Sequence, residues 1–251
     1  MISITNTDII GTNTMNSLSL SSSLPISDTT TLPTSIPSSI PSSIPTPVSV
    51  STTLPDKSRK KGYLELILGP MFSGKTSTLK KIYDQCMYCS IPVMVINYSG
   101  DKRYSSEDVM STHDKIMIPC IMANSITEIM ENHSEKVSNA EVILINEGQF
   151  FSDIQEVIPL VEELNKRVYI CGLDGDFQKN KIGSLFDLIP FCDNICKLKS
   201  LCSECRDGTP GLFSYRITNE VDQVVIGVDN YKPLCRVCYR RLTIKKHSAK
   251  L

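Results

Sequence analysis

Short runs of apolar residues along the chain alternate with segments whose apolar positions recur at helical spacing. The apolar runs occupy residues 63–68, 92–97, 141–145 and 167–172. The segments with helical spacing are residues 77–83, 125–131 and 153–164. Continuous apolar strands that alternate with helices are typical of a parallel sheet covered on both faces. The pattern therefore predicts an α/β fold.

A glycine-containing turn joins the first predicted strand to the first predicted helix. Residues 69–76 read Gly-Pro-Met-Phe-Ser-Gly-Lys-Thr and fit the P-loop pattern GxxxxGK[ST] in its strand–turn–helix setting. In such a loop the backbone N–H groups bind phosphate oxygens, Lys75 reaches the β- and γ-phosphates, and the Thr76 hydroxyl binds Mg²⁺. The alternative is a glycine turn that matches by chance. The motif predicts binding of a nucleoside triphosphate.

Polar residues follow the third and fourth predicted strands. Ligands of parallel sheets collect outside the carboxyl ends of the strands, so Asn146, Glu147 and Asp174 are expected to share one crevice with the P-loop. P-loop proteins usually place an acid after the third strand to hold Mg²⁺, but Asn146 is neutral. Glu147 is either that acid shifted by one position, a base for an acceptor hydroxyl, or a surface carboxylate that caps the next helix. Phe150 is either core or a substrate contact.

Composition narrows the class of protein. The chain has 251 residues, 41% of them hydrophobic, and a formal net charge of −1, so it can bury one sizeable core but lacks the basic field typical of nucleic-acid binding. No apolar run approaches the roughly 20 residues of a membrane span, and no secretory signal follows Met1. Ten cysteines without an export signal indicate a reducing compartment. We expect a soluble cytoplasmic protein without nucleic-acid or membrane partners.

Both ends of the chain are expected to lie outside the fold. Residues 1–61 are rich in Ser, Thr and Pro and predict a disordered tail. A mitochondrial transit peptide is the alternative, but the first basic residue is Lys57. Residues 242–251 are expected to form a basic C-terminal tail. Its last residues, 249–251, resemble a peroxisomal address, although a chance match is the preferred interpretation.

Two C-x-x-C pairs near the C-terminus suggest a metal site. Their four thiolates match a tetrahedral structural zinc site, and independent thiols are the alternative. The expected zinc ligands are Cys202, Cys205, Cys235 and Cys238. A long excursion, residues 206–234, separates the pairs and includes a strand-like stretch at 223–226. Cys86 and Cys89 share the C-x-x-C spacing but lack a second pair.

Together these motifs resemble the type II (cytosolic) thymidine kinases. The resemblance spans residues 62 to about 241 and rests on the P-loop, Asp101–Tyr104 with Thr112–Asp114, Glu147–Phe151, Leu173–Gln178, the paired C-x-x-C motifs, and Val225–Gly227 with Tyr231. It implies a RecA-like P-loop kinase domain at 62–199 and a zinc-binding domain at 200–241, whose lasso loop within 206–234 folds over the nucleoside. The implied reaction transfers the γ-phosphoryl group of ATP to the 5′-hydroxyl of thymidine, with catalytic Mg²⁺ and structural Zn²⁺. Such enzymes are typically cytoplasmic homotetramers inhibited by dTTP.

Carried over by motif, the resemblance assigns Glu147 as the base for the 5′-hydroxyl. The triphosphate side of the site would comprise Gly69, Pro70, Met71, Phe72, Ser73, Gly74, Lys75, Thr76, Asp101, Lys102, Arg103, Asn146, Gly148 and Gln149. The thymidine side would comprise Met71, Phe150, Leu173, Phe177, Ser214, Gln223, Val224, Val225, Ile226, Gly227 and Tyr231.

The chain departs from the family pattern in three places. Asn146 replaces the usual Asp, which predicts a kinase that needs more free Mg²⁺ than its Asn146→Asp variant. The segment between Cys205 and Ser214 is longer than in the animal enzymes. Ile182 stands where those enzymes have an aromatic residue.

Two other classes of function fit the P-loop. A nucleic-acid-stimulated ATPase would combine a RecA-like core with a zinc ribbon, but it predicts a basic face that the near-neutral charge does not favour. A catalytically idle nucleotide-binding regulator is consistent with Asn146. ATP consumption with thymidine, with single-stranded DNA and with neither would distinguish the three.

Overall fold

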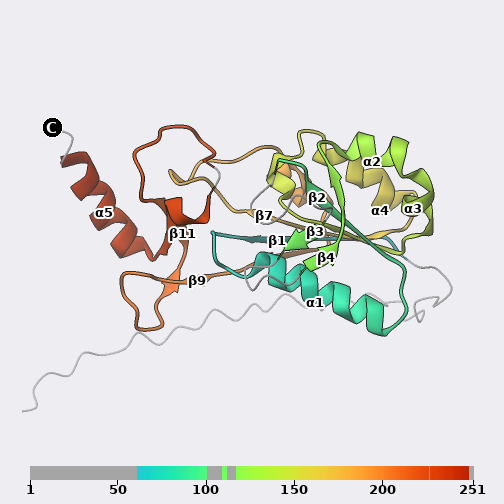
Figure 1. Ribbon diagram of the computed structural model, residues 1–251, viewed down its shortest axis with the longest axis horizontal. Coiled ribbons are helices and arrows are strands. Elements are labelled where there is room, and N and C mark those ends of the chain that lie inside the picture. Colours follow the sequence, from blue (N-terminus) through green and yellow to red (C-terminus); the bar gives the residue numbers. More distant parts are fainter. Residues whose placement is uncertain (1–60, 101–108, 112–116, 226, 249–251) are drawn as a thin grey trace, which may run out of the picture. The chain divides into compact units, whose positions relative to one another are not determined.

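A six-stranded parallel sheet forms the centre of the structure, a computed structural model that describes residues 61–100, 109–111, 117–225 and 227–248 (Figure 1). The strand order is β5-β2-β6-β7-β1-β8. The strands are β1 (Tyr63–Gly69), β2 (Val93–Tyr98), β5 (Ile121–Ala123), β6 (Val142–Ile145), β7 (Arg167–Leu173) and β8 (Asn194–Lys197). The four predicted strands and the α/β class are confirmed. The sequence analysis missed β5 and β8, which are short strands at the two edges of the sheet and lack a long apolar run.

Helices cover both faces of the sheet, as the continuous apolar strands predict (Figure 1). Leu64, Leu66 and Leu68 of β1 belong to one core cluster, while Ile67 belongs to a second cluster. The first cluster packs against α2 (Ile126–Asn132), α3 (Ser134–Asn139) and α4 (Val157–Glu162). The second packs against α1 (Lys75–Tyr88). Because adjacent residues of a strand point to opposite faces, one short apolar run supplies both cores.

Local hydrogen bonds define the helix starts on the α2 face. Ser125 caps α2 by accepting a hydrogen bond from the Glu128 N–H at 3.1 Å. The carboxylate of Asp153 accepts from the N–H groups of Ile126 and Thr127 at 2.9 and 2.8 Å. The helix expected at 153–164 is divided into a 3₁₀ turn, η2 (Ile154–Glu156), followed by α4. Asp153 therefore stabilises the start of a helix that lies 26 residues earlier in the chain.

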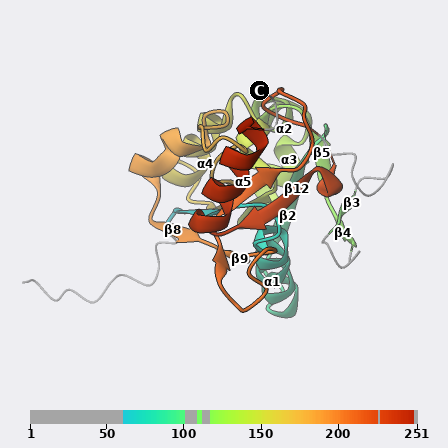
Figure 2. The ribbon, with the colours of Figure 1, turned by 90° about the vertical axis from the view of Figure 1, so that its left-hand side faces the viewer.

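The C-terminal part of the chain forms two small hairpins and a helix. Strands β9 (Ser200–Leu201) and β10 (Pro210–Gly211) pair antiparallel, as do β11 (Phe213–Arg216) and β12 (Tyr231–Leu234). The helix α5 (Arg236–Ser248) packs against the β11–β12 hairpin (Figure 2). A third apolar cluster, which includes Leu234 and Tyr239, lies here. The remaining elements are β3 (Val109–Ser111), β4 (Met117–Pro119), η1 (Gly148–Phe150), η3 (Leu185–Phe191) and η4 (Val228–Asn230).

Two expectations for this part of the chain need correction. Residues 223–225, which read as a strand, have no strand partner, and the paired strands lie on either side of them. Residues 242–248, expected as a tail, continue α5, because Leu242 packs against the third cluster and anchors the helix. The segments 1–60 and 249–251 lie outside the described residues. None of the helices in the described part combines the length and hydropathy needed to cross a bilayer.

Candidate active site and metal centre

A cavity of about 470 Å³ lies at the carboxyl ends of the strands. Four segments that are distant in sequence meet there: the P-loop, the ends of β6 and β7, and the lasso. Most predicted site residues border it, namely Met71, Phe72, Ser73, Gly74, Lys75, Thr76, Asn146, Glu147, Phe150, Leu173, Phe177, Ser214, Gln223, Val224, Val225, Gly227 and Tyr231. Asp101, Lys102, Arg103 and Ile226 lie outside the described residues. The convergence follows from parallel strands whose carboxyl ends share one edge of the sheet.

The P-loop has the geometry of an anion cradle. Gly74 adopts a left-handed conformation (φ 82°), and no side chain caps the start of α1 there, so the first N–H groups of the helix are oriented for a ligand. A Cβ at Gly69 would lie 2.5 Å from Ser73 Oγ and 2.9 Å from the backbone oxygen of Leu198, so the close approach of the backbone favours glycine where the loop curls. Ser73 Oγ is buried and has no hydrogen-bond partner among the described residues. An unsatisfied hydroxyl in a phosphate loop fits a ligand that supplies the acceptor.

Lys75 is buried at the base of this loop. Its ammonium group donates a hydrogen bond to the carbonyl oxygen of Pro70 at 2.9 Å. This contact explains Pro70, whose carbonyl orients the lysine although the residue does not border the cavity. The lysine is therefore held close to the cradle by the loop's own backbone.

Glu147 occupies the loop directly after β6 and adopts a left-handed conformation (φ 56°, ψ 41°). For a residue with a side chain this costs on the order of 1–3 kcal/mol, so the surrounding contacts must impose it. Its carboxylate accepts a hydrogen bond from Gln149 Nε2 at 2.6 Å, and Gln149 Oε1 accepts from the Leu173 N–H at 3.0 Å. Gln149 thus joins the ends of β6 and β7 and fixes the carboxylate. Gly148 lies between Glu147 and Gln149 in the chain and packs against β7, because a Cβ at Gly148 would approach the Ile170 side chain to 2.4 Å.

Asn146 borders the cavity, but both ends of its amide are bound by protein. Its amide N–H donates to Asn97 Oδ1 at 2.8 Å, and its Oδ1 accepts from the Cys171 thiol at 2.9 Å. The residue is 3% exposed. Because protein groups bind both ends of the amide, Asn146 orients this edge of the sheet, and its assignment to the triphosphate side of the site stays a prediction. The strand register brings Asn97, Asn146 and Cys171 together from β2, β6 and β7.

The apolar side of the cavity separates the two adjacent phenylalanines. Phe150 borders the cavity and lies 5.3 Å from the Tyr98 ring, measured between centroids. Phe151 is fully buried in the core. Ile182 also borders the cavity and is 6% exposed, so an aliphatic side chain fills that position. Of the two alternatives for Phe150, the cavity position favours substrate contact over core.

The lasso is tied to the P-loop and to the loop after β7. Ser214 Oγ accepts a hydrogen bond from the Met71 N–H at 2.9 Å. Gln223 Nε2 donates to the Asp176 carboxylate at 3.1 Å and to the Lys181 carbonyl at 3.0 Å. These contacts place the main chain of residues 223–225 along the cavity.

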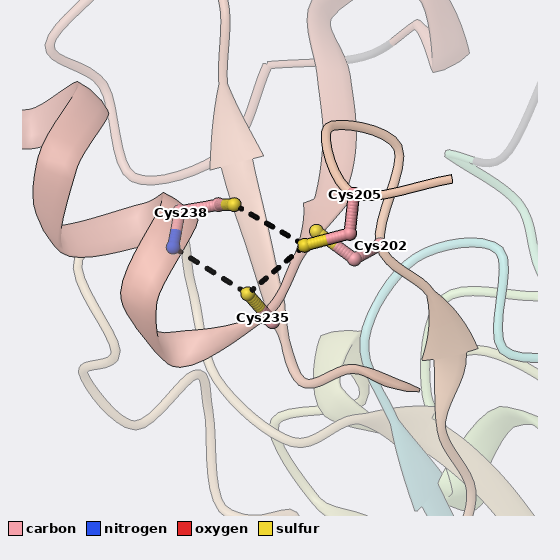
Figure 3. Close-up of side chains that lie close together, drawn as sticks. All are labelled: Cys202, Cys205, Cys235 and Cys238. Carbon is pink, nitrogen blue, oxygen red and sulfur yellow. Dashed lines mark hydrogen bonds between the residues drawn. The ribbon is translucent and has the colours of Figure 1, made fainter. Parts of the chain in front are cut away.

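Four cysteine sulfurs gather at the base of the lasso (Figure 3). The Sγ atoms of Cys202, Cys205, Cys235 and Cys238 all lie within 4.8 Å of one another. The Cys205 sulfur is 3.8 Å from that of Cys235 and 3.5 Å from that of Cys238. Four Zn–S bonds of about 2.3 Å in a tetrahedron require sulfurs about 3.8 Å apart, so the cluster fits zinc. Among the described residues, Cys86 and Cys89 join no such cluster.

The cluster favours ionisation of one sulfur, that of Cys202, while the hydrogen bond with Cys205 raises the pKa of Cys238 to about 12. Burial opposes ionisation of Cys202, but the backbone N–H groups of Cys235, Cys205 and Glu204 outweigh it and lower the pKa of Cys202 to about 6. A thiolate is the form that binds zinc.

The chain is similar in sequence to known thymidine kinases. The profile of the thymidine kinase family matches residues 62–239. The chain belongs to the thymidine kinase family. It is 35% identical over 193 residues to the cytosolic thymidine kinase of Cricetulus griseus, covering 76% of this chain and 80% of that protein. It is 37% identical over 184 residues to the thymidine kinase of Yaba monkey tumor virus, covering 73% and 97%.

The chain is also similar to a third thymidine kinase and, weakly, to one solved structure. The chain is 33% identical over 195 residues to the cytosolic thymidine kinase of Homo sapiens, covering 76% of this chain and 80% of that protein. Among solved structures, domain III of the Thermotoga maritima replication initiation protein DnaA aligns with a TM-score of 0.34 at 18% identity over 57% of each chain. That likeness is too low to support an argument. Membership of the thymidine kinase family confirms the resemblance recognised from the motifs.

Sequence reasoning missed several residues of this thymidine kinase site. Tyr98, Asp176 and Ser77 border the cavity but belong to none of the assigned sets. Asp176 is 6% exposed and accepts hydrogen bonds from the N–H groups of Gln178 and Asn180 at 2.8 Å each. The sequence signal that could have identified Asp176 was its position three residues after Leu173, the last residue of β7. No sequence signal marked Tyr98 as a site residue, because a tyrosine at the end of an apolar strand is typical of the core.

Proposed function

We propose that the protein transfers the γ-phosphoryl group of ATP to the 5′-hydroxyl of thymidine and so forms dTMP. One observation carries the proposal: a single cavity joins a P-loop, a fixed carboxylate and an apolar, lasso-lined chamber. A triphosphate cradle alone would suit many nucleotide-binding proteins. The apolar, lasso-lined side of the same cavity supports an acceptor of nucleoside size, and membership of the thymidine kinase family supports thymidine as that acceptor.

Phosphoryl transfer passes through a loose transition state, so the protein mainly positions the reactants and neutralises charge. In this proposal the loop 69–76 binds the triphosphate through the Lys75 ammonium and the backbone N–H groups of residues 72–76, since Pro70 has no N–H and that of Met71 donates to Ser214. Mg²⁺, when bound, supplies further positive charge to the phosphate oxygens. The Thr76 hydroxyl is the protein oxygen donor that we assign to it. Asp101, Lys102 and Arg103 remain a proposal on motif grounds.

Glu147 is the proposed base for the 5′-hydroxyl. A positioned base contributes about 10²–10⁴-fold to the rate. Gln149 supports this role, because its hydrogen bond restricts the carboxylate to one orientation. The strained backbone of Glu147 also supports it, since strained residues concentrate where function requires a fixed geometry.

The lasso is proposed to hold the thymine and sugar and to exclude water. Ser214, Tyr231 and the main chain of 223–227 would make the polar contacts, and Met71, Phe150, Leu173 and Phe177 the apolar ones. The Cys₄ cluster is proposed to bind one structural zinc ion that fixes both ends of the lasso. We further propose that the protein is a cytoplasmic homotetramer inhibited by dTTP, a nucleotide that carries both thymine and a triphosphate. The kinase domain at 62–199 and the zinc-binding domain at 200–241 are likewise proposals.

The test is product formation by the full chain. ATP consumption should require thymidine, yield dTMP and be unaffected by single-stranded DNA. Glu147→Gln should lower kcat by about 10²–10⁴-fold while ATP still binds. Glu162→Gln, on the exposed surface of α4, is the matched control with the same loss of charge. Turnover of Glu147→Gln within a few-fold of the parent would refute the base assignment. ATP hydrolysis that depends on DNA and not on thymidine would refute the function.

A further inference from the structure

Arg216 is the largest side chain among those that are fully buried in the described structure. It lies on β11 and is 1% exposed. Its guanidinium donates to the carbonyl oxygens of Glu220 and Gln223, each at 3.1 Å, and also to that of Asp222. The Tyr231 hydroxyl oxygen accepts a further hydrogen bond at 2.5 Å. One side chain therefore joins residues 220–223 of the loop 217–230, which connects β11 to β12, to the first residue of β12.

The guanidinium also reaches the loop after β7. Its central carbon lies 3.8 Å from the centroid of the Phe177 ring, which borders the cavity. The centroid of the Tyr231 ring lies 5.1 Å from the same carbon. Arg216 itself does not border the main cavity. It contacts the groups that form the wall, and the N–H of Val225 donates to the same Tyr231 oxygen at 3.2 Å.

Burying the charge of Arg216 costs free energy, so the residue is not explained by the stability of the interior alone. Burying a charge is unfavourable unless it is paired, yet within the described residues the guanidinium donates only to neutral oxygens, and its effect on the exposed Glu220 carboxylate is through space. Its Nε is buried and has no hydrogen-bond partner there. A well-packed apolar residue would cost less. What arginine adds is a rigid, planar fork of donors that fixes several carbonyls at once.

We propose that Arg216 is a positioning residue that holds the lasso closed over the nucleoside and thereby sets thymidine affinity without touching thymidine. The inference rests on the proposed function. The fork fixes residues 220–223, and these lead directly into the main chain at 223–225 along the cavity. Tyr231 and Phe177 transmit the same restraint to the opposite wall. Thymidine binding then depends on Arg216, whereas the ATP cradle at 69–76 does not.

Two variants separate charge from geometry. Arg216→Lys keeps the charge but replaces the fork with one ammonium group, and Arg216→Met keeps the apolar stem alone. Arg216→Lys loses at least one of the four hydrogen bonds and the fork geometry, and Arg216→Met loses all four, so KM for thymidine should rise about 10- to 100-fold, with the smaller rise in Arg216→Lys. KM for ATP should stay within about twofold. Arg240→Lys and Arg240→Met, on the exposed face of α5, are the matched controls.

A second readout reports the lasso directly. Glu220 is exposed on the loop, and a glutamate-specific protease cleaves after it. Thymidine should protect this bond in the parent and in the Arg240 variants, but about tenfold less in the Arg216 variants at equal thymidine concentration. Zinc content should stay at the parental value. Equal rises in both KM values, loss of zinc, or unchanged protection would each overturn the positioning role. Thymidine turnover by the parent tests the proposed function separately, and its absence would refute that function whatever the variants show.

Discussion

Replacing Asn146 with aspartate tests whether this residue serves the metal or the fold. In the parent its amide donates to Asn97 Oδ1 at 2.8 Å and accepts from the Cys171 thiol at 2.9 Å. A carboxylate can only accept, so the contact with Asn97 becomes two oxygens facing one another at a site that is 3% exposed. The variant loses one hydrogen bond and gains a buried charge, of which one oxygen faces the Asn97 oxygen instead of a donor.

The magnitude follows from those two terms. The lost hydrogen bond costs about 0.5–1.5 kcal/mol, and the unsatisfied acceptors add about 1–3 kcal/mol before protonation or a rotated Asn97 relieves them. We expect the free energy of unfolding to fall by about 2–4 kcal/mol, which lowers the melting temperature by about 5–15 °C in a domain of this size. Burial next to an acceptor raises the pKa of the new carboxyl. Since the protonated form can donate to Asn97, the stability difference should shrink as the pH falls.

The assay compares thermal unfolding of parent and Asn146→Asp at pH 8 and pH 5.5, with zinc present. Asn139→Asp makes the same charge change on the exposed end of α3 and should shift the melting temperature by less than about 2 °C. Rates measured against free Mg²⁺ at fixed ATP complete the test, and the half-saturating Mg²⁺ should not fall in the variant. A variant that is as stable as the parent and needs less Mg²⁺ would show that residue 146 faces the metal, and the reasoning from its hydrogen bonds would fail.

Two further predictions concern the metal centre and the α2 face. Metal analysis should find about one zinc per chain, and Cys235→Ser should lose it and raise KM for thymidine more than KM for ATP; a zinc-free parent with full activity would contradict this. Asp153→Ala should cost about 1–2 kcal/mol of stability by removing the acceptor for the Ile126 and Thr127 N–H groups. Partial burial favours a higher pKa for Asp153, but these donors outweigh it and lower the pKa. The contribution is therefore present above about pH 4 and lost as the pH falls through the folded value, so parent and variant should converge in acid; a constant difference would exclude the carboxylate as its source.

Local patterns were sufficient for the elements that form the floor of the site. The run 63–68 and the P-loop after it specify a strand, a glycine turn and a helix through residues that are adjacent in the chain. The spacing of Cys202, Cys205, Cys235 and Cys238 likewise predicted the cluster in Figure 3. The edge strands β5 and β8 were not predictable in this way. With a neighbouring strand on only one side, each is short, and its run of residues is too brief to carry a pattern.

The lasso shows most clearly what the sequence alone could not determine. The apolar stretch 223–226 reads as a strand, but Arg216 and Asp176 bind Gln223 and Tyr231 binds Val225, so that residues 223–225 line the cavity without a paired strand. That outcome depends on carbonyl acceptors and donors from different loops, which no local pattern records.

Asn146 makes the same point for the catalytic edge of the sheet. Its neighbours in sequence suggested a metal ligand, because an acid usually follows this strand. Strand register instead places Asn97 and Cys171 beside it, 49 and 25 residues away in the chain. The sequence by itself determined the class of fold, the phosphate loop and the four thiols, because each depends on residues close in the chain. Tertiary structure decided which polar groups face the cavity and which face one another, because hydrogen bonds in a buried site are satisfied across strands.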